Sequence, residues 1–251
     1  MKFLLVSDLH YTLKQFDWLH GVAEQFDLVV IAGDHLDISA IASVDAQVVV
    51  VLKYLRRLKE RTRLVVSSGN HDLTGRGTSG ERVARWMAKV REIGVPADGD
   101  AIELGDLTIT ICPWWDGPDT CAEVGEQLAR DARRRGPKWM WVYHAPPDQS
   151  PLSWNGTTHY GDSALREWIR TYGPDIVLTG HIHQAPFRQG GSWVDRIGST
   201  WVFNAGRQIG PSPTHVIVDL DEQSAKWFSL AGDEVVRLDQ PHAERQPLSP
   251  P

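Results

Sequence analysis

Residues that can bind a metal ion follow five apolar runs in this 251-residue chain. The five groups are "SDLH" with Asp8 and His10, "AGDH" with Asp34, "GNHD" with Asn70 and His71, "YHAPP" with His144, and "TGHIH" with His181 and His183. Carboxylate, amide and imidazole groups each offer a lone pair to a cation. This mixture of oxygen and nitrogen ligands suits Mn, Fe, Co or Zn, and the absence of Cys from the set disfavours a purely structural zinc site.

Spacing within the groups strengthens this interpretation. Residues two apart in a strand face the same way, so Asp8 and His10 can converge on one ion. The two histidines of "GHIH" can do the same if their strand has not yet turned. A glycine directly precedes the ligand residue in "GDH", "GNHD" and "GHIH", and lets the backbone approach a site closely. Any one of these histidines is more often a core or capping residue, but that alternative needs five independent coincidences, so we favour one shared metal centre.

The segments that must position these residues alternate between strand-like and helix-like patterns. Apolar runs of strand length occupy residues 2–10, 26–37, 63–72, 138–147 and 175–183, and helical periodicity occupies residues 14–26, 45–61, 81–94, 121–136 and 163–173. Hairpin-like strand pairs occupy 101–115 and 191–206, with further strands at 214–221 and 225–239. We therefore expect an α/β fold of two packed sheets with helices outside, and chemistry at the carboxyl ends of the strands.

Composition limits the classes of function. A hydrophobic fraction of 41% is enough for a substantial core, and a net charge of -6 with charges spread along the chain argues against a stable nucleic-acid partner. Cys112 and Cys121 form no disulfide framework and no CxxC pair, so we expect reduced thiols. The first apolar run stops at Asp8, too short for a signal or membrane segment, so we expect a cytoplasmic protein with no membrane association. We expect a single domain over residues 1–240 and a frayed, Pro-rich tail over 241–251.

As a set, the five groups resemble the calcineurin-like metallophosphoesterase superfamily, and within it the small phosphodiesterase-like members. The family signature is D-x-H, G-D, G-N-H-[DE], H and G-H-x-H in that order, and this chain has "DLH", "GDH", "GNHD", "YHAPP" and "GHIH". The motifs run from Asp8 to His183. The resemblance implies a four-layer α/β/β/α sandwich of two mixed β-sheets flanked by helices, with a dinuclear metal centre at the strand ends.

The resemblance also implies the ligands of two transition-metal ions, which would be Mn, Fe or Zn. One ion is similar to the family site held by Asp8, His10, Asp34 and His183. The other resembles the family site held by Asp34, Asn70, His144 and His181. On this assignment Asp34 is the bridging ligand between the two ions.

The implied reaction is hydrolysis of a phosphoester by a hydroxide that bridges the two ions, which also bind the phosphoryl oxygens. His71 is left over from the ligand set, and would protonate the leaving alkoxide or stabilise the equatorial oxygens. Asp72 would hold the His71 imidazole in the useful tautomer and favour its protonated form. The stretch "GNHD" is thus interpreted as ligand, acid and orienting residue in turn.

The expected substrate is a small phosphoester, most simply a nucleotide or similar diester. Protein phosphatases of the superfamily are disfavoured, because they continue motif two as G-D-x-V-D-R-G and end motif three in Glu, where this chain has "GDHLDIS" and "GNHD". Four residues are candidates for substrate contact: His35, Arg76, Trp114 and His159. Each also has a plainer interpretation, as a packed, solvated or core side chain.

Three alternative functions stay open. The chain could be a phosphomonoesterase, or a nuclease like the repair members of the superfamily, although its acidity and its lack of a Lys/Arg stripe weigh against a nuclease. It could also be a non-catalytic binding scaffold, but a scaffold has no physical need of so many costly polar groups in one place. A homodimer through the hairpin edges is a further possibility.

Overall fold

The computed structural model describes residues 1–242, and its first sheet has six strands. In spatial order they are β14 (Gly232–Arg237), β13 (Ser224–Ser229), β12 (His215–Asp219), β1 (Lys2–Val6), β2 (Leu28–Ala32) and β3 (Arg63–Ser67). The strands β1, β2 and β3 are parallel, and the other neighbours pair antiparallel. The parallel half carries three of the five metal-ligand motifs at its carboxyl edge.

The second sheet also has six strands and is again mixed. In spatial order they are β10 (Val194–Ile197), β11 (Thr200–Asn204), β9 (Ile176–Thr179), β8 (Lys138–Val142), β7 (Leu107–Ile111) and β6 (Ala101–Leu104). The four central strands are parallel, and the two edge strands pair antiparallel with their neighbours. A small separate hairpin, β4 (Gly75–Arg76) with β5 (Arg82–Val83), follows the third motif.

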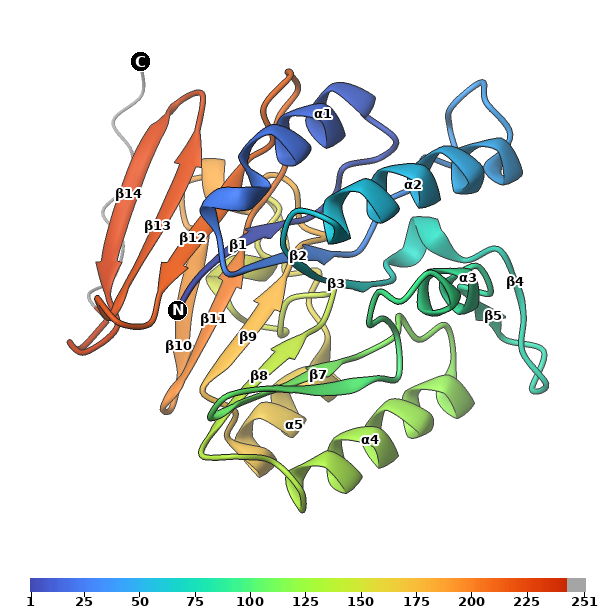
Figure 1. The fold of residues 1–251 in the computed structure, drawn as a ribbon. Coiled ribbons are helices and arrows are strands. Elements are labelled where there is room, and N and C mark those ends of the chain that lie inside the picture. Colours follow the sequence, from blue (N-terminus) through green and yellow to red (C-terminus); the bar gives the residue numbers. More distant parts are fainter. Residues whose placement is uncertain (243–251) are drawn as a thin grey trace.

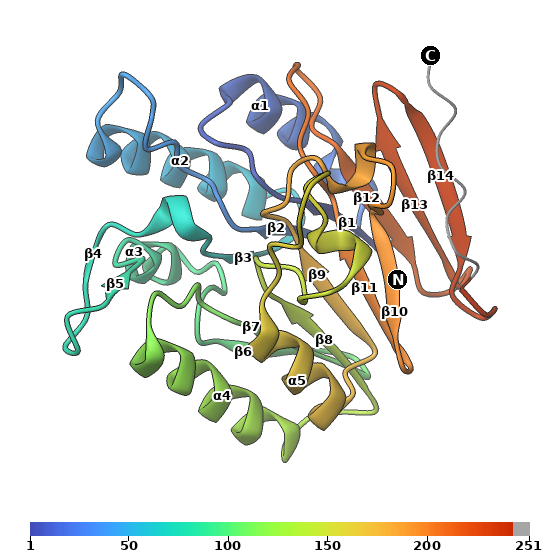
Figure 2. The same ribbon diagram turned by 180° about the vertical axis from the view of Figure 1, so that it is seen from behind.

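Helices cover the outer face of each sheet. The helices are α1 (Leu13–Val22), α2 (Val44–Lys59), α3 (Met87–Glu92), α4 (Pro118–Ala132) and α5 (Ser163–Tyr172). In Figures 1 and 2, α1 and α2 lie over the first sheet, and α4 and α5 lie on the far side of the second. The start of α5 is fixed by the Asp162 carboxylate, which accepts hydrogen bonds from two amides of its first turn, and its end by Gly173 in the left-handed region.

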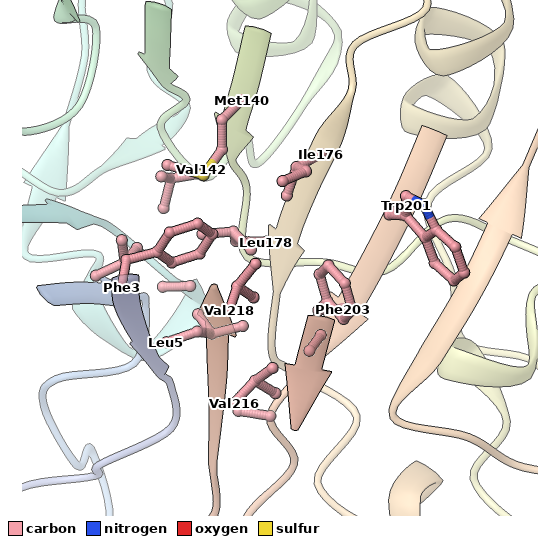
Figure 3. Packing of buried hydrophobic residues seen from close by; sticks show 14 of the residues in the cluster. Phe3, Leu5, Met140, Val142, Ile176, Leu178, Trp201, Phe203, Val216 and Val218 are labelled. Atoms are coloured by element: carbon pink, nitrogen blue, oxygen red, sulfur yellow. The ribbon is translucent and has the colours of Figure 1, made fainter. Parts of the chain in front are cut away.

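The main core lies between the two sheets. Phe3, Leu5 and Val218 from the first sheet pack against Val142 and Leu178 from the second, as Figure 3 shows. These side chains are fully buried, and burial of each stabilises the fold by about 1.5–3 kcal/mol. Two further apolar clusters fill the spaces between each sheet and its helices. The alternation of side chains along the strands therefore gives the inner and outer faces of each sheet an apolar layer of its own.

The predicted α/β/β/α sandwich is confirmed, with two differences in its elements. The helix predicted over 81–94 is confined to Met87–Glu92, because residues 82–83 pair with β4 instead. The helix predicted from 121 begins at Pro118, whose fixed φ suits the first turn of a helix. Most of the predicted C-terminal tail, residues 243–251, lies outside the described residues. Within residues 1–242, no helix is long and apolar enough to span a membrane.

Candidate metal centre

The loops that follow β1, β2 and β3 in the first sheet and β8 and β9 in the second meet at one edge of the molecule. Within the first sheet, the amide of His10 donates to the carbonyl of Asp34 at 2.9 Å. Between the sheets, the amide of His181 donates to the carboxylate of Asp8 at 3.1 Å. Parallel strands present their carboxyl ends at a common edge, so residues far apart in sequence become neighbours here.

One cluster brings together Asp8, His10, Asp34 and His183, whose ligand atoms all lie within 4.8 Å of one another. His183 Nε2 is 3.2 Å from an oxygen of Asp8, and His10 Nε2 is 3.5 Å from an oxygen of Asp34. The Nε2 atoms of His10 and His183 are themselves only 3.1 Å apart. These are the four residues that the resemblance assigns to one ion.

A second cluster brings together Asp34, His144 and His181. His144 Nε2 is 3.3 Å from an oxygen of Asp34, and Asn70 Oδ1 is 2.9 Å from Nδ1 of His181. These are the four residues that the resemblance assigns to the other ion. Asp34 belongs to both clusters, as a bridging ligand must.

The donor atoms fit a pair of cations. His144 Nε2 is buried and has no hydrogen-bond partner within the described residues, so its lone pair or proton faces the centre unsatisfied. Two ring nitrogens that approach within hydrogen-bond distance, beside two buried carboxylates, are the arrangement expected of side chains aimed at a common ion. Such a group of polar side chains would be costly to bury without an ion.

The backbone at the centre adopts conformations that side chains normally avoid. Asp8, His10, Asp34 and His181 have φ values of 56°, 40°, 54° and 68°, in the left-handed region. Only three other non-glycine residues among those described share this feature, so the strain gathers at the centre. The neighbouring glycines make room, because a Cβ on Gly69 would lie 2.7 Å from the Asp34 amide nitrogen.

Both buried carboxylates are held in their charged form. Burial alone would raise the pKa of Asp8, but the hydrogen bond from His183 and the charge of His144 outweigh it and lower the pKa. For Asp34 burial is likewise outweighed, mainly by the charge of His144 at 3.3 Å, and its pKa falls far below the usual range. Conversely, the charges of Asp34 and Asp8 overcome burial at His144 and raise its pKa to about 9. The carboxylates thus attract positive charge to the centre.

The other two strongly shifted histidines respond in the opposite direction. Burial lowers the pKa of His10 to about 4, although the charges of Asp34 and Asp8 partly oppose it. Burial and the charge of His144 lower the pKa of His181 to about 4. Both rings are therefore neutral at pH 7, the form in which an imidazole nitrogen can bind a metal.

Asp72 was predicted to hold the His71 imidazole, and this prediction is wrong, because Asp72 binds other residues. The fully buried Asp72 carboxylate accepts hydrogen bonds from the amides of His35, Leu36 and Gly69 and from the His35 ring. Nδ1 of His71 has no hydrogen-bond partner within residues 1–242. Asp72 is the last residue of the short helix η2 (Asn70–Asp72), and its side chain binds the loop after β2 instead of the adjacent His71.

Asp37, which lies outside the five motifs, is a carboxylate close to His71. Its carboxylate lies within 4.8 Å of ring nitrogens of both His71 and His10, and the His71 ring meets the His10 ring edge-on at 4.5 Å. The signal was present in "GDHLD", where a second Asp follows the bridging Asp34 by three residues.

The four candidate substrate residues have different environments. Trp114 lies at the centre, with its ring 5.1 Å from that of His181 and 5.6 Å from that of His144. His35 is fully buried between Asp72 and Trp86, so the prediction that it contacts substrate is wrong.

The other two candidates bind their own loops. The guanidinium of Arg76 donates to the carbonyl of Gly80 within the β4–β5 hairpin. His159 lies within hydrogen-bond distance of the Ser153 hydroxyl, and its ring lies 5.1 Å from that of Trp154 at a tilt of 52°. Neither has a described contact with the two clusters.

The sandwich and the two clusters that share Asp34 define the class of protein: an α/β/β/α fold with a candidate dinuclear metal centre at the strand ends. A sequence profile of calcineurin-like phosphoesterases matches residues 1–185, and the chain belongs to this family. Members of the family typically depend on two metal ions. No curated protein sequence matches the chain.

Solved structures share the fold at low sequence identity. The protein TT1561 of Thermus thermophilus is 14% identical with a TM-score of 0.60, and the match covers 94% of this chain and 98% of that one. A putative 5'-nucleotidase from Staphylococcus aureus is 14% identical with a TM-score of 0.53 over 96% of this chain and 55% of that one. A purple acid phosphatase from yellow lupin (Lupinus luteus) seeds is 12% identical with a TM-score of 0.54 over 95% of this chain and 51% of that one.

Proposed function

We propose that this protein is a two-metal phosphodiesterase that acts on a small nucleotide or a similar diester. The observation that carries the proposal is the convergence of seven ligand-type side chains from five loops into two clusters that share Asp34. Two ions held there would polarise the phosphoryl group, neutralise its developing charge and activate water as the nucleophile. The proposed ligands of the first ion are Asp8, His10, Asp34 and His183, and those of the second are Asp34, Asn70, His144 and His181.

We assign His71 as the proton donor to the leaving group. Its ring lies beside His10 at the edge of the first cluster and is partly exposed, so a bound substrate can reach it. Asp37, within 4.8 Å of His71, takes the orienting role first given to Asp72, because a carboxylate this close can hold the imidazole in position. Asp72 affects the centre indirectly, because its hydrogen bonds fix the loop that carries Asp34.

The position of Trp114 favours a substrate that carries an aromatic group. The ring is partly buried, rests against two proposed ligands of one ion and is fixed at its backbone by a hydrogen bond from its amide to the Ser68 hydroxyl at 2.9 Å. A fixed indole beside a phosphoryl site can stack on a base or an aryl group. The neighbouring Trp115 is structural, because its ring nitrogen donates to Tyr143 and Asp162.

The proposal is tested by hydrolysis of bis(p-nitrophenyl) phosphate and p-nitrophenyl phosphate with metal-stripped protein resupplied with Mn. The wild type is compared with Asp34→Asn, which keeps the size of the side chain and removes the bridging charge. We expect metal-dependent turnover that favours the diester and is lost in the variant. Turnover of the monoester alone would make the protein a phosphomonoesterase, and no turnover of either with Mn, Fe or Zn would favour the scaffold.

A further inference from the structure

Arg207 lies beside the candidate metal centre and takes no part in the proposed chemistry. It lies on the loop after β11, and its amide donates to the carbonyl of His183 at 3.0 Å. Gly206 makes this contact possible, since its φ is 70° and a Cβ there would lie 2.6 Å from Cγ of Pro186. The backbone of Arg207 is therefore fixed against one of the proposed ligands.

The rest of this loop is also held in place by hydrogen bonds. The buried Gln15 side chain donates to the carbonyls of Gln208 and Gly210 at 3.1 and 3.2 Å, and the Thr214 hydroxyl donates to the carbonyl of Gly206 at 2.7 Å. These contacts fix the segment on both sides of Arg207. A side chain on such a segment loses little backbone freedom when a ligand binds to it.

The guanidinium of Arg207 nevertheless has no ion pair and no hydrogen bond within residues 1–242. The residue is only partly exposed, and its positive charge is close enough to His10 to lower the pKa of that ring. Asp8 and Asp34, the buried carboxylates of the centre, lie close to histidines, at 3.2 Å from His183 and 3.3 Å from His144. A partly buried arginine whose backbone is fixed against His183 and whose guanidinium has no partner within residues 1–242 is available for an anion from outside the chain.

The charges of the ions, the carboxylates and the substrate indicate which kind of anion Arg207 binds. Two divalent ions would carry more positive charge than Asp8 and Asp34 carry negative charge, so the single negative charge of a phosphodiester is already compensated at the centre. A further fixed cation beside the centre therefore matches a substrate with more negative charge than one diester group. The planar guanidinium suits the paired oxygens of a phosphate.

We propose that Arg207 binds a second phosphate group of the substrate, next to the phosphoester that is cleaved. This inference rests on the proposed function and deepens it, because it names the substrate class. The backbone of Arg207 lies by His183 of the first cluster, whereas Trp114 lies by His144 and His181 of the second. An aromatic group and a second phosphate on either side of the cleaved phosphoester describe a nucleotide that carries an additional phosphate.

The test is a binding measurement that needs no turnover. Isothermal titration calorimetry compares thymidine 3',5'-bisphosphate with thymidine 5'-phosphate on the Mn-loaded protein. A bidentate charge-assisted contact is worth about 1.5–3 kcal/mol, so we expect the wild type to bind the bisphosphate about tenfold or more tightly than the monophosphate. Arg207→Gln should bring this ratio close to one, and Arg207→Lys should retain part of it, because the charge remains and the paired geometry is lost.

Arg134→Gln is the matched control, because it removes the same charge from the exposed turn between α4 and the amino end of β8, at the other end of that strand from His144. It should keep the wild-type ratio. A ratio near one in the wild type, or a high ratio that persists in Arg207→Gln, would overturn the inference. Equal weakening of both ligands in Arg207→Gln would also overturn it, since Arg207 would then contact the single phosphate.

Turnover of bis(p-nitrophenyl) phosphate, which has one phosphate, keeps this test separate from the test of the proposed function. If that diester is hydrolysed and the binding ratio is one, the phosphodiesterase proposal stands and the Arg207 proposal fails. If no diester is hydrolysed but the ratio is high and depends on Arg207, the anion site stands and the phosphodiesterase proposal fails.

Discussion

At the residue scale, the candidate centre consists of side chains whose protonation states depend on one another. The charged forms of Asp8 and Asp34 keep His144 protonated to about pH 9 in the protein by itself, while burial keeps His10 neutral. A cation that binds here must displace the proton from the His144 ring, because only a deprotonated imidazole nitrogen can bind a metal. Metal binding is therefore accompanied by proton release, and affinity should rise with pH up to about 9.

Replacement of His71 separates metal binding from proton donation. His71→Ala should keep both metals and lose on the order of 10² in turnover, because the leaving group would depart without a proton. The loss should be smallest for p-nitrophenyl, the leaving group that needs the proton least. Kinetics with a series of aryl and alkyl leaving groups, alongside metal analysis, give the answer. An equal loss across the series would contradict the acid role.

The bridging role of Asp34 predicts unequal effects of two ligand substitutions. Asp34→Asn should weaken both metal sites, because its carboxylate belongs to both clusters. His10→Ala should weaken mainly one site, because, of the two clusters that share Asp34, it belongs only to the one with Asp8 and His183. Metal titration of the two variants under the same conditions measures this difference. The bridging assignment would be wrong if both variants lost metal alike.

At the scale of elements, short loops bring the ligands together, and Asp72 joins two of these loops. Its carboxylate connects the loop after β2, through His35 and Leu36, to the loop after β3, through Gly69. The side chain is fully buried, so its loss leaves several donors without an acceptor and without water.

Asp72→Ala should therefore lower the free energy of unfolding by roughly 3 kcal/mol and weaken metal binding, although Asp72 is not a proposed ligand. Asp72→Asn, of equal size with one acceptor oxygen retained, should lose less of both. Urea unfolding and Mn titration of the two variants test this. If Asp72→Ala were as stable as the wild type, the carboxylate would not be what joins the loops.

Gly69 tests how closely the same two loops approach. A Cβ on Gly69 would lie 2.7 Å from the Asp34 amide nitrogen and 2.8 Å from Cδ2 of His144, so Gly69→Ala should displace the loop, lower the melting temperature and weaken metal binding. The control is Gly21→Ala in α1, where nothing lies within 4 Å. That change should be neutral or stabilise by up to about 1 kcal/mol through helix propensity. Similar melting temperatures for both variants would contradict the close packing.

At the scale of the whole molecule, the buried Asp98 couples stability to pH. It lies beneath the loop after β3, where its carboxylate accepts a hydrogen bond from the Ser68 amide at 2.7 Å. Burial raises the pKa of Asp98 from 3.8 to about 7, and the charge of Asp72 contributes. Because the folded-state pKa is raised, the folded state binds the proton more tightly. This stabilisation is complete below pH 3.8 and is lost as the pH rises to about 7.

Asp98→Asn should remove this dependence, because the amide is neutral at every pH and can still accept the bond from Ser68. Relative to the wild type, the variant should gain about 2 kcal/mol in the free energy of unfolding between about pH 5.5 and about pH 8.5. Urea unfolding of both metal-free proteins at the two pH values measures the difference, and the titrations common to both proteins cancel. A constant difference between the two proteins would show that Asp98 does not titrate in this range.

The sequence by itself predicted the architecture and the side chains that gather at the strand ends, whereas their division between two ions came from the family resemblance. Apolar strand runs and helical periodicity are local patterns, and a motif at the end of a parallel strand can only reach the edge where the other parallel strands end. For this reason it could be predicted that seven residues meet: Asp8, His10, Asp34, Asn70, His144, His181 and His183. Two helix boundaries differ from the prediction. The helix predicted over 81–94 is shortened by a two-residue strand pair, and α4 begins earlier than predicted, at a proline.

Only the tertiary structure decided which polar groups face one another around the centre. The order in "GNHD" suggested that Asp72 serves His71, yet the turn of η2 sends its carboxylate to His35, and Asp37 approaches His71 from a different loop. The place of Arg207, beside His183 and unpaired within residues 1–242, was equally invisible in the sequence. Strand patterns are set by neighbours along the chain, whereas these pairings are set by how loops from two sheets meet. Those contacts depend on individual side-chain rotamers and loop turns, which produce no repeating pattern of residues in the sequence.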